Sequence, residues 1–569
     1  MNYAKIVADE NGYYINVNNE YISFVDRSGS YKGNVELKGK EICGLIKNAD
    51  NIPAALLSDV NGKANIALLE NTSVSSENLC GNTASEMIAA CAGIGEFSIA
   101  AVFYDAMYGL KGDEWIKLCD FTENDFAAYE VSGIVMTSEN SFIVSVNGND
   151  GAVLKRMSQR DASEKNNAQT VKIATVVHDD ELSYYVRKYN SANDKYKIEI
   201  VNYAQGQNYE ENVNALKMDI ISGNAPDIIP FNASMPIDAF GSKESIFVDL
   251  YSMIDKDPDL SREDFVDGFL EGMASNGKLL MITPSFSVKT IECKDKFLNG
   301  LTNWNYDQMM ECYSKVSDKI ELSVESKYGS STSAFCDIIN YNSFIDYDNG
   351  ICDFNNETFI KLMKFFKDHD IGSADNSGWD SDMIRDHFKN DVIMLKVTEV
   401  PNFIEMYAIE REYFNEPATI IGYPTESGSV SYVEIENGYS ILSNSDVKEG
   451  AWDFLKYSFF DESYYKGTEG SYIFPAVDKY IDEQIENVNM LILESQKEEK
   501  DAVPISDNEI NEYKVWVRES AKNVVKRDQN VFGILSDELN AFFNDERSAE
   551  DTADMIQNRV SIYLSEQYQ

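Results

Sequence analysis

The sequence predicts two kinds of fold in one chain, an all-β region over residues 1–157 and an α/β region over residues 171–569. Residues 1–157 alternate apolar and polar side chains between short polar turns, which is typical of antiparallel strands. Residues 158–170 are rich in Ser, Asn, Gln and charge, as linkers are. Beyond the linker, strand and helix patterns alternate, which predicts a sheet covered by helices.

Length and charge limit the possible functions. The chain has 569 residues, and single domains rarely grow beyond about 250–300, so we expect at least two domains. It carries 49 Lys and Arg against 96 Asp and Glu, a formal charge of −47. Because nucleic-acid binding draws much of its affinity from cations that neutralise phosphates, we expect no nucleic-acid partner. No stretch approaches 18 consecutive apolar residues, so the sequence predicts no membrane-spanning helix.

The cysteines and histidines of this chain do not stand at the spacings typical of a metal site, and the few histidines argue against a catalytic set built from them. None of the eight cysteines forms a CxxC pair, and the three histidines lack zinc-binding spacing. We therefore expect no metal, no cofactor and no enzymatic activity. Disulfide pairing stays open.

The all-β region repeats one pattern, two strands joined by a tight turn. GYYINVNNEYISFVDRSG places Asn18-Asn19 between two strands, and ALLSDVNGKANIALLE places Asn61-Gly62 there. Asn and Gly tolerate the positive φ of such turns. GIVMTSENSFIVSVNGNDGAVLKRM adds turns at Glu139-Asn140 and at 147–151. Successive hairpins indicate a propeller-like domain or a meander.

The α/β region begins with the order β-α-β-α-β. Its strands are Val171–Val177, Lys197–Tyr203 and the segment DIIPF at 227–231. The first helix repeats apolar residues from Leu182 to Tyr189, and the second carries Val213, Leu216, Ile220 and Ile221 on one face. Gly223 can end the second helix in the left-handed conformation, and Pro226 keeps Ala225 out of the helical region. This order calls for a parallel sheet.

The carboxyl ends of these strands indicate where a ligand would bind. In open α/β sheets ligands bind beyond those ends. His178, Tyr203 and Asn232 stand there in the sequence, so we expect each to face a ligand crevice. A surface or helix-capping role for His178 is the alternative.

A series of segments in the α/β region carries a resemblance to a known family. They are YNSANDKYKIEIVNY with SGNAPDII, FVDLYSMIDKDPDLSREDF with NGKLLMITPSF, WNYDQMMECYSK, FKNDVIMLKVTEVPNF, and the run IGYPTESGSVSYVEIENGYSILSNSDVKEGAWDFLKY. In this order they resemble the extracellular solute-binding proteins of ABC importers, in the group whose better-known members take up sugars. The resemblance covers about 400 residues from Lys172 onward. Asn390-Asp391 departs from the usual Asn-Gly or Ser-Gly.

The resemblance implies a two-lobed periplasmic-binding-protein-like fold of type II, preceded by the all-β region. It implies capture of a small solute, above all a carbohydrate or oligosaccharide, between lobes that close about a hinge. The implied partners are the permease subunits of an ABC transporter, and the implied location is the cell surface, reached through a lipid anchor. The start MNYAKIVADENGYY lacks a signal-peptide pattern, so we expect export signal and anchor to lie outside the given sequence.

Sugar sites combine aromatic platforms with polar side chains, which selects further candidates. Trp379 stands in the polar loop DNSGWDSDMI rather than on an apolar stripe. Ser285 follows the strand GKLLMITP, and Tyr423 and Tyr432 flank the loop GYPTESG. Trp304, Trp452 and Trp516 lie on predicted helices, where we expect packing roles.

Two other functions stay open from the sequence. A secreted carbohydrate-active enzyme would need a pair of carboxylates about 5–10 Å apart, and 96 acidic residues make a chance pair uninformative. A surface protein that binds a partner without transport is the other, because this kind of fold serves many ligands.

Overall fold

The computed structural model divides the chain into two compact units, Met1–Ala225 and Pro226–Gln569. The structure describes residues 6–568 except 38–39, 59–63, 80–86, 104–105, 121–125, 127, 149–150, 159–167, 178, 205–207, 233–245, 317–319, 348, 373–379, 436, 466–472, 496–503 and 527.

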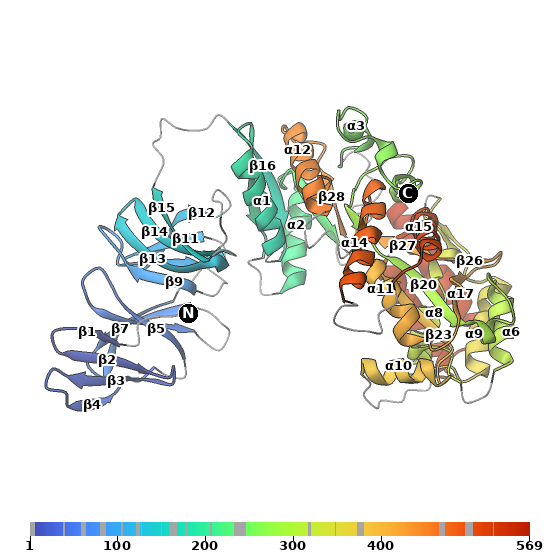
Figure 1. The fold of residues 1–569 in the computed structure, drawn as a ribbon, viewed down its shortest axis with the longest axis horizontal. Helices are drawn as coiled ribbons and strands as arrows, with labels where there is room; N and C mark the ends of the chain where they lie inside the picture. The colour runs from blue at the N-terminus through green and yellow to red at the C-terminus, as the bar shows by residue number, and fades with distance from the viewer. Residues whose placement is uncertain are drawn as a thin grey trace. The chain divides into compact units, whose positions relative to one another are not determined.

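The described residues before 159 form four antiparallel sheets, and each sheet is a meander in chain order (Figure 1). The first sheet holds β1 (Ile6–Ala8), β2 (Gly12–Val17), β3 (Tyr21–Asp26) and β4 (Tyr31–Asn34). The second holds β5 (Glu41–Lys47), β6 (Pro53–Ser58), β7 (Ala64–Glu70) and β8 (Ser73–Leu79). The third holds β9 (Met87–Ala92), β10 (Ile99–Phe103), β11 (Ala106–Lys111) and β12 (Glu114–Asp120). The fourth holds β13 (Val131–Ser138), β14 (Ser141–Gly148) and β15 (Gly151–Ser158). The predicted all-β region is confirmed.

The first hairpin shows why the turn residues predict the strands. Asn18 and Asn19 join β2 to β3 with φ of 54° and 64°, the left-handed region that asparagine tolerates better than most residues. The Asn16 side chain accepts a hydrogen bond from the backbone N–H of Asn19 at 3.0 Å. The predicted turn at Asn61-Gly62 lies outside the described residues.

Apolar side chains between neighbouring sheets hold the four sheets together in chain order. One core packs Tyr14 and Phe24 of the first sheet against Leu45 and Leu57 of the second. A second core packs the other face of the second sheet against the third, and a third core packs the third sheet against the fourth. Strand β10 is buried at every position, because its sheet has a neighbour on both faces.

The β-α-β-α part of the prediction is confirmed in the first unit. Strand β16 (Gln169–Thr175) pairs in parallel with β17 (Tyr196–Asn202), and helix α1 (Asp180–Ala192) connects them. Leu182, Tyr185, Val186 and Tyr189 are all buried, as their spacing predicts. Helix α2 (Tyr209–Ser222) follows. Its predicted apolar face is wrong at Ile221, which is 73% exposed because it lies beside Ile220 on the turn of the helix that faces water.

Gly223 ends α2 in the left-handed conformation, with φ of 77°. Its N–H donates to the carbonyl of Ile220 at 3.2 Å, and the N–H of Asn224 donates to the carbonyl of Asp219 at 2.9 Å. These bonds satisfy carbonyls that have no partner inside the helix. The motif SGNAPD therefore ends helix α2, as the sequence predicts.

Gly223→Ala is expected to lower the free energy of unfolding by about 1 kcal/mol, because a Cβ is disfavoured in the left-handed region. Thermal unfolding of the full chain checks this value. The substitution Gly223→Asn should cost less than Gly223→Ala, since asparagine tolerates this conformation. An alanine variant as stable as the wild type would contradict the role of the glycine.

A five-stranded sheet organises the second unit. Strand β20 (Val288–Lys294) pairs antiparallel with β23 (Leu395–Val400), β24 (Ala418–Ile420) and β27 (Tyr432–Ile435), and β27 pairs in parallel with β30 (Val524–Lys526). Outside the five-stranded sheet, β18 (Ile228–Asn232) pairs antiparallel with β28 (Asn437–Ile441). The short strands β19 (Ser285–Phe286) and β29 (Phe474–Pro475) also pair. Sheet partners in this unit thus come from distant parts of the chain.

A large core of this unit packs side chains of the five-stranded sheet against neighbouring helices. Trp304 is fully buried there, and its Nε1–H donates to the carbonyl of Gly422 at 2.9 Å. The helices of eight or more residues are α6 (Tyr306–Ser314), α8 (Ser331–Ile338), α9 (Glu357–Asp368), α10 (Ser381–Lys389), α12 (Lys448–Phe459), α14 (Lys479–Ser495), α15 (Asp507–Ala521), α16 (Gln529–Phe543) and α17 (Ala549–Tyr568).

Trp452 and Trp516 of the second unit also donate hydrogen bonds through their indole N–H groups. Trp452 of α12 is 6% exposed, and its Nε1–H donates to Asp257 at 2.8 Å. Trp516 of α15 donates to Ser431 at 3.3 Å. The expected packing roles of Trp304 and Trp452 are confirmed, and Trp516 is partly buried.

Candidate functional site

At two places in the second unit the chain passes, within a few residues, between the five-stranded sheet and the strand pairing around β28. Each place is called a crossing, and it joins these two strand systems. Ile282 forms a β-bridge with Tyr439 of β28, and a few residues later Val288 pairs with Val433 of β27. Strand β27 ends at Ile435 and β28 begins at Asn437, two positions later in the sequence. A short crossing leaves few backbone torsions between the two systems, and hinges in proteins are built from such element-terminal residues.

A cavity of about 140 Å³ lies at these crossings. Its lining combines hydroxyls, carboxylates, an amide and apolar side chains: Thr283, Ser285, Phe286, Ser287, Glu399, Pro401, Glu434, Ile435, Asn437 and Ile473. Ligand pockets for drug-sized molecules span about 300–1,000 Å³, so this cavity would hold one part of a larger ligand.

The polar groups around the cavity are fixed by contacts with one another. The Ser287 hydroxyl donates to Glu399, and the Thr283 hydroxyl donates to the carbonyl of Ser285 at 3.0 Å. The ammonium of Lys289 lies 2.6 Å from a carboxylate oxygen of Glu434, whose side chain is only 9% exposed. These contacts hold two carboxylates in place beside the opening.

Lys289 stands between the two carboxylates in the register of the sheet. It is the direct partner of Glu399 on β23, and cross-strand partners point to the same face. Two positions along β27 from its partner Tyr432 lies Glu434, which therefore shares that face. Lys289, Glu399 and Glu434 therefore lie on one face of the sheet.

Asp337 of α8 is a third acidic residue near this face, and its carboxyl interacts electrostatically with Lys289. Burial, and after it the charge of Glu325, raises the pKa of Asp337 to about 7, while Lys289 acts in the opposite direction. Its neighbours Tyr423 and Tyr432 lie in the core, 4% and 8% exposed, with ring centroids 4.9 Å apart. Burial raises the pKa of both tyrosines.

The structure places the sequence-predicted site residues in different surroundings. Ser285 lines the cavity. Asn232 is the register partner of Asn437, which also lines it. Tyr423 and Tyr432, predicted to flank a binding loop, instead pack into the hydrophobic core. Tyr203 belongs to the first unit, where its hydroxyl donates to Asp219 at 2.7 Å. Trp379 and His178 lie outside the described residues.

Sequence reasoning missed the two glutamates and the asparagine of the cavity. Glu434 and Asn437 stand in the run YVEIENG, within a segment quoted only for its resemblance. Glu434 is a charged residue on an otherwise apolar strand, and this break in the pattern could have drawn attention to it. Nothing in the sequence near Glu399 indicates that β23 pairs with β20, because the two strands are far apart in the chain.

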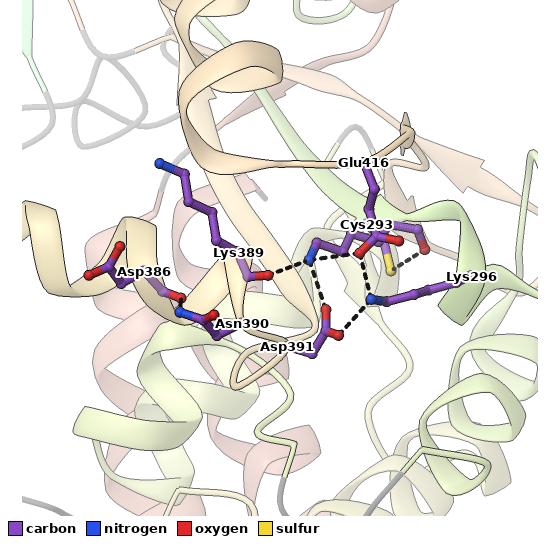
Figure 2. Close-up of polar contacts among 8 residues, drawn as sticks. Cys293, Lys296, Asp386, Lys389, Asn390, Asp391 and Glu416 are labelled. Atoms are coloured by element: carbon purple, nitrogen blue, oxygen red, sulfur yellow. Dashed lines mark hydrogen bonds and ion pairs between the residues drawn. The ribbon is translucent and has the colours of Figure 1, made fainter.

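Asn390-Asp391, the departure from the family's usual Asn-Gly, has a structural explanation. Asp391 has φ of 60°, the backbone region that glycine prefers, and aspartate tolerates it better than most residues. Its carboxylate binds Lys294 at 2.7 Å and Lys296 at 2.6 Å, and Glu416 binds Lys294 at 3.0 Å (Figure 2). The Lys294 side chain is 1% exposed. The aspartate therefore neutralises a buried lysine instead of touching the cavity.

The ion pairs of this cluster affect both acidic groups. Burial acts to raise the pKa of Asp391, but hydrogen bonds from Lys294 and Lys296 outweigh it and hold this pKa below its usual range. Hydrogen bonds from Lys296, and after it Lys294, hold the pKa of Glu416 low. Both carboxyls are therefore charged at neutral pH.

Two further findings concern membrane spans and cysteine pairing. No helix within the described ranges is both long and apolar enough to span a membrane. Among the cysteines that the structure describes, Cys91, Cys293, Cys312, Cys336 and Cys352 are free thiols.

Solved structures of low sequence identity are similar to this chain. An ABC substrate-binding protein from Listeria monocytogenes in complex with cycloalternan has 14% identity and a TM-score of 0.45, covering 70% of this chain and 99% of its own. A periplasmic oligogalacturonide binding protein from Yersinia enterocolitica has 13% identity and a TM-score of 0.48, with coverages of 70% and 100%. A sugar-binding protein from Xanthomonas citri has 11% identity and a TM-score of 0.47, with coverages of 70% and 98%. Similarity this low does not identify the ligand of this chain.

A comparison with curated proteins found no match. The model of one family does match, over residues 176–464, just over half of the chain, and its description is bacterial extracellular solute-binding protein. The match contains α1, α2, the five-stranded sheet up to β27, and all the cavity residues except Ile473. The chain therefore belongs to the bacterial extracellular solute-binding proteins.

Proposed function

We propose that this protein captures a carbohydrate outside the cell and delivers it to the permease subunits of an ABC importer, and that the cavity at the strand crossings is part of the ligand site. The chemistry of the lining carries the proposal. Ser285, Glu399 and Asn437 line the cavity together with the apolar side chains of Phe286, Pro401 and Ile473.

Such a lining suits a sugar because a sugar ring offers hydroxyls at its edges and weakly apolar C–H faces. Carboxylates accept hydrogen bonds from hydroxyls, and hydrogen bonds to charged groups contribute about 1.5–3 kcal/mol each. Apolar side chains gain from covering the C–H faces. The small volume fits one ring of an oligosaccharide, whose other rings would extend beyond the opening.

The position of the cavity at the crossings couples ligand binding to a change of conformation. A ligand that contacts Ser285 before β20 and Asn437 after β27 would touch both crossing segments at once. Binding shifts a conformational equilibrium only by its differential affinity for the two states. We propose that these contacts supply that difference and that the filled form is the one the permease recognises.

The first test is a thermal-shift and calorimetric screen of the full chain against mono- and oligosaccharides, polyols, amino acids and short peptides. A ligand at a hundred times its Kd adds about 2.7 kcal/mol of stability, which raises the midpoint measurably. The proposal expects hits among sugars, with the sugar recovered intact after incubation. A hit confined to peptides or amino acids would contradict carbohydrate capture, and steady turnover of the sugar would contradict a capture protein.

Glu399→Gln is expected to weaken binding of the identified sugar about tenfold, because an amide accepts hydrogen bonds from hydroxyls less strongly than a carboxylate does. Ser285→Ala should weaken it to a similar extent. Calorimetric titration of each variant measures the change. Glu449→Gln on the exposed surface of α12 is the matched control and should bind as the wild type does.

The same titration tests Trp379, which stays a predicted contact. Trp379→Ala should weaken binding if its loop supplies a platform for a sugar ring. If Glu399→Gln and Ser285→Ala both bind with wild-type affinity while Trp379→Ala does not, the ligand site lies away from the cavity.

A further inference from the structure

The two carboxylates that line the cavity differ in their ionic partners. The Glu434 side chain is 9% exposed, and one of its oxygens lies 2.6 Å from the ammonium of Lys289. Glu399 accepts a hydrogen bond from the Ser287 hydroxyl. Among the residues that the structure describes, no Lys, Arg or His forms an ion pair with Glu399. The charge of one carboxylate is therefore balanced by a neighbour, and the charge of the other is not.

The register of the sheet shows that the nearest lysine is already engaged. Lys289 of β20 is the direct cross-strand partner of Glu399 on β23, yet its ammonium contacts Glu434 on the β27 side. All three side chains point to one face of the sheet. Their formal charges add to +1 − 2 = −1, with the excess at Glu399.

The rest of the cavity lining does not offset this charge. Its other polar side chains are the hydroxyls of Thr283, Ser285 and Ser287 and the amide of Asn437, and the described lining contains no Lys, Arg or His. An ammonium group beside Glu399 would supply the missing cation through a charge-assisted hydrogen bond. A neutral hydroxyl would make a weaker bond there, and a second carboxylate would be repelled.

We propose that the cavity binds an amino sugar with a free ammonium group in preference to the matching neutral sugar, that it rejects acidic sugars, and that Glu399 sets this order. This inference rests on the proposed function, because it concerns the sugar that the same cavity takes. A volume of about 140 Å³ suits one sugar ring, so monosaccharides are sufficient probes.

Titration of the full chain with matched monosaccharides, followed by calorimetry and ligand-observed NMR, tests this order. The sets are glucose, glucosamine and glucuronate; galactose, galactosamine and galacturonate; and mannose, mannosamine and mannuronate. At about pH 6 the amines are protonated and the uronates ionised. In a set that binds, the amino sugar should bind about fivefold more tightly than the neutral sugar, the upper range for a partly exposed charge pair. The uronate should bind at least about tenfold more weakly than the neutral sugar, because it loses a hydrogen bond and gains repulsion.

Glu399→Gln should bring the ratio of amino-sugar to neutral-sugar affinity close to one. The whole chain also attracts cations through its formal charge of −47, but this variant keeps −47 + 1 = −46. A preference that came from the overall charge would therefore survive the substitution. Glu449→Gln removes the same charge from the exposed surface of α12, and this matched control should keep the wild-type ratio.

Lys289→Met provides a readout that a structural role alone would not give. Without its ammonium, Glu434 also faces the cavity as an unbalanced carboxylate, so the preference for the amino sugar should rise further. Damage to the sheet would weaken both sugars alike and leave their ratio unchanged. In the wild type, raising NaCl from about 50 to 500 mM should reduce the preference while leaving the affinity for the neutral sugar nearly constant, because salt screens charges.

The results separate this inference from the proposed function. If a neutral sugar binds as tightly as its amino counterpart, or a uronate binds more tightly than either, the inference is wrong and carbohydrate capture stands. If Glu399→Gln keeps the wild-type preference, Glu399 is not its source. N-acetylglucosamine carries no ammonium and should follow glucose; equal binding of glucosamine and N-acetylglucosamine would contradict a role of charge. If no member of any set binds, the cavity does not hold a sugar ring, and the proposed function fails together with this inference.

Discussion

Lys294→Met is expected to lower the free energy of unfolding of the second unit by about 3 kcal/mol, in the range measured when one partner of a buried ion pair is removed. Methionine keeps most of the volume of the lysine stem, so the change isolates the charge. The substitution takes away the cation that Asp391 and Glu416 share, and the carbonyl of Lys389 loses its donor at 3.2 Å. Urea unfolding followed by tryptophan fluorescence measures the change, because four of the five tryptophans lie beyond residue 225.

Lys296→Met is the matched control for that experiment. Lys296 binds the same two carboxylates, but its side chain is 37% exposed against 1% for Lys294. Exposed ion pairs contribute about 0–1 kcal/mol, so this loss should be below 1 kcal/mol. Equal losses in the two variants would show that burial of Lys294 does not set the strength of the cluster.

Asp337→Asn is expected to stabilise the protein above pH 7, by about 2 kcal/mol. Raising the pKa of Asp337 from 3.8 to about 7 corresponds to roughly 4 kcal/mol, and partial solvation of this carboxyl reduces the expected effect. The folded state keeps the proton up to about pH 7, whereas the unfolded chain releases it near pH 4. The stability that this proton provides is complete below pH 4 and is lost as the pH rises to about 7. Asparagine removes that loss.

The measurement is urea unfolding of wild type and variant at intervals from pH 4 to pH 8. The difference between the two chains should grow across this window and level off above pH 7, while other titrating groups cancel. Glu325→Gln removes one cause of the raised pKa, so it should move the midpoint of the wild-type decline to lower pH. A difference that does not change with pH would mean that Asp337 is ionised in the folded protein throughout.

Much of the fold could be predicted because local chemistry specifies it. Asn18-Asn19 sets a hairpin through the φ values that asparagine tolerates, and Gly223 ends a helix for the same kind of reason. Ser548 precedes α17, and its hydroxyl accepts a hydrogen bond from the N–H of Asp551 at 3.1 Å. Each of these features depends on residues within a few positions of one another.

The candidate site was harder to predict because it depends on pairing between distant strands. Glu399 reaches the cavity only because β23 pairs with β20, more than a hundred residues earlier in the chain. Tyr423 and Tyr432 flank a polar loop in the sequence, yet both rings pack into the core beside Trp304. A loop position alone does not show which way an aromatic side chain points. Ser285 lines the cavity, but it begins the short strand β19, whereas the sequence predicts a strand over residues 277–284 that would end before it.

The different strand pairings of the two units determine when each can fold during synthesis. Every sheet before residue 159 pairs neighbouring strands, so each can form as soon as its own segment has emerged from the ribosome. The second unit differs because β30 completes its sheet only at residues 524–526, and α17 fills the core with Val560 and Leu564. Domains generally fold in the order of their synthesis, so the sheets form first. The second unit can bind a ligand only when nearly the whole chain has been synthesised. Until then, the nascent chain carries folded N-terminal sheets and a second unit whose sheet and core are still incomplete.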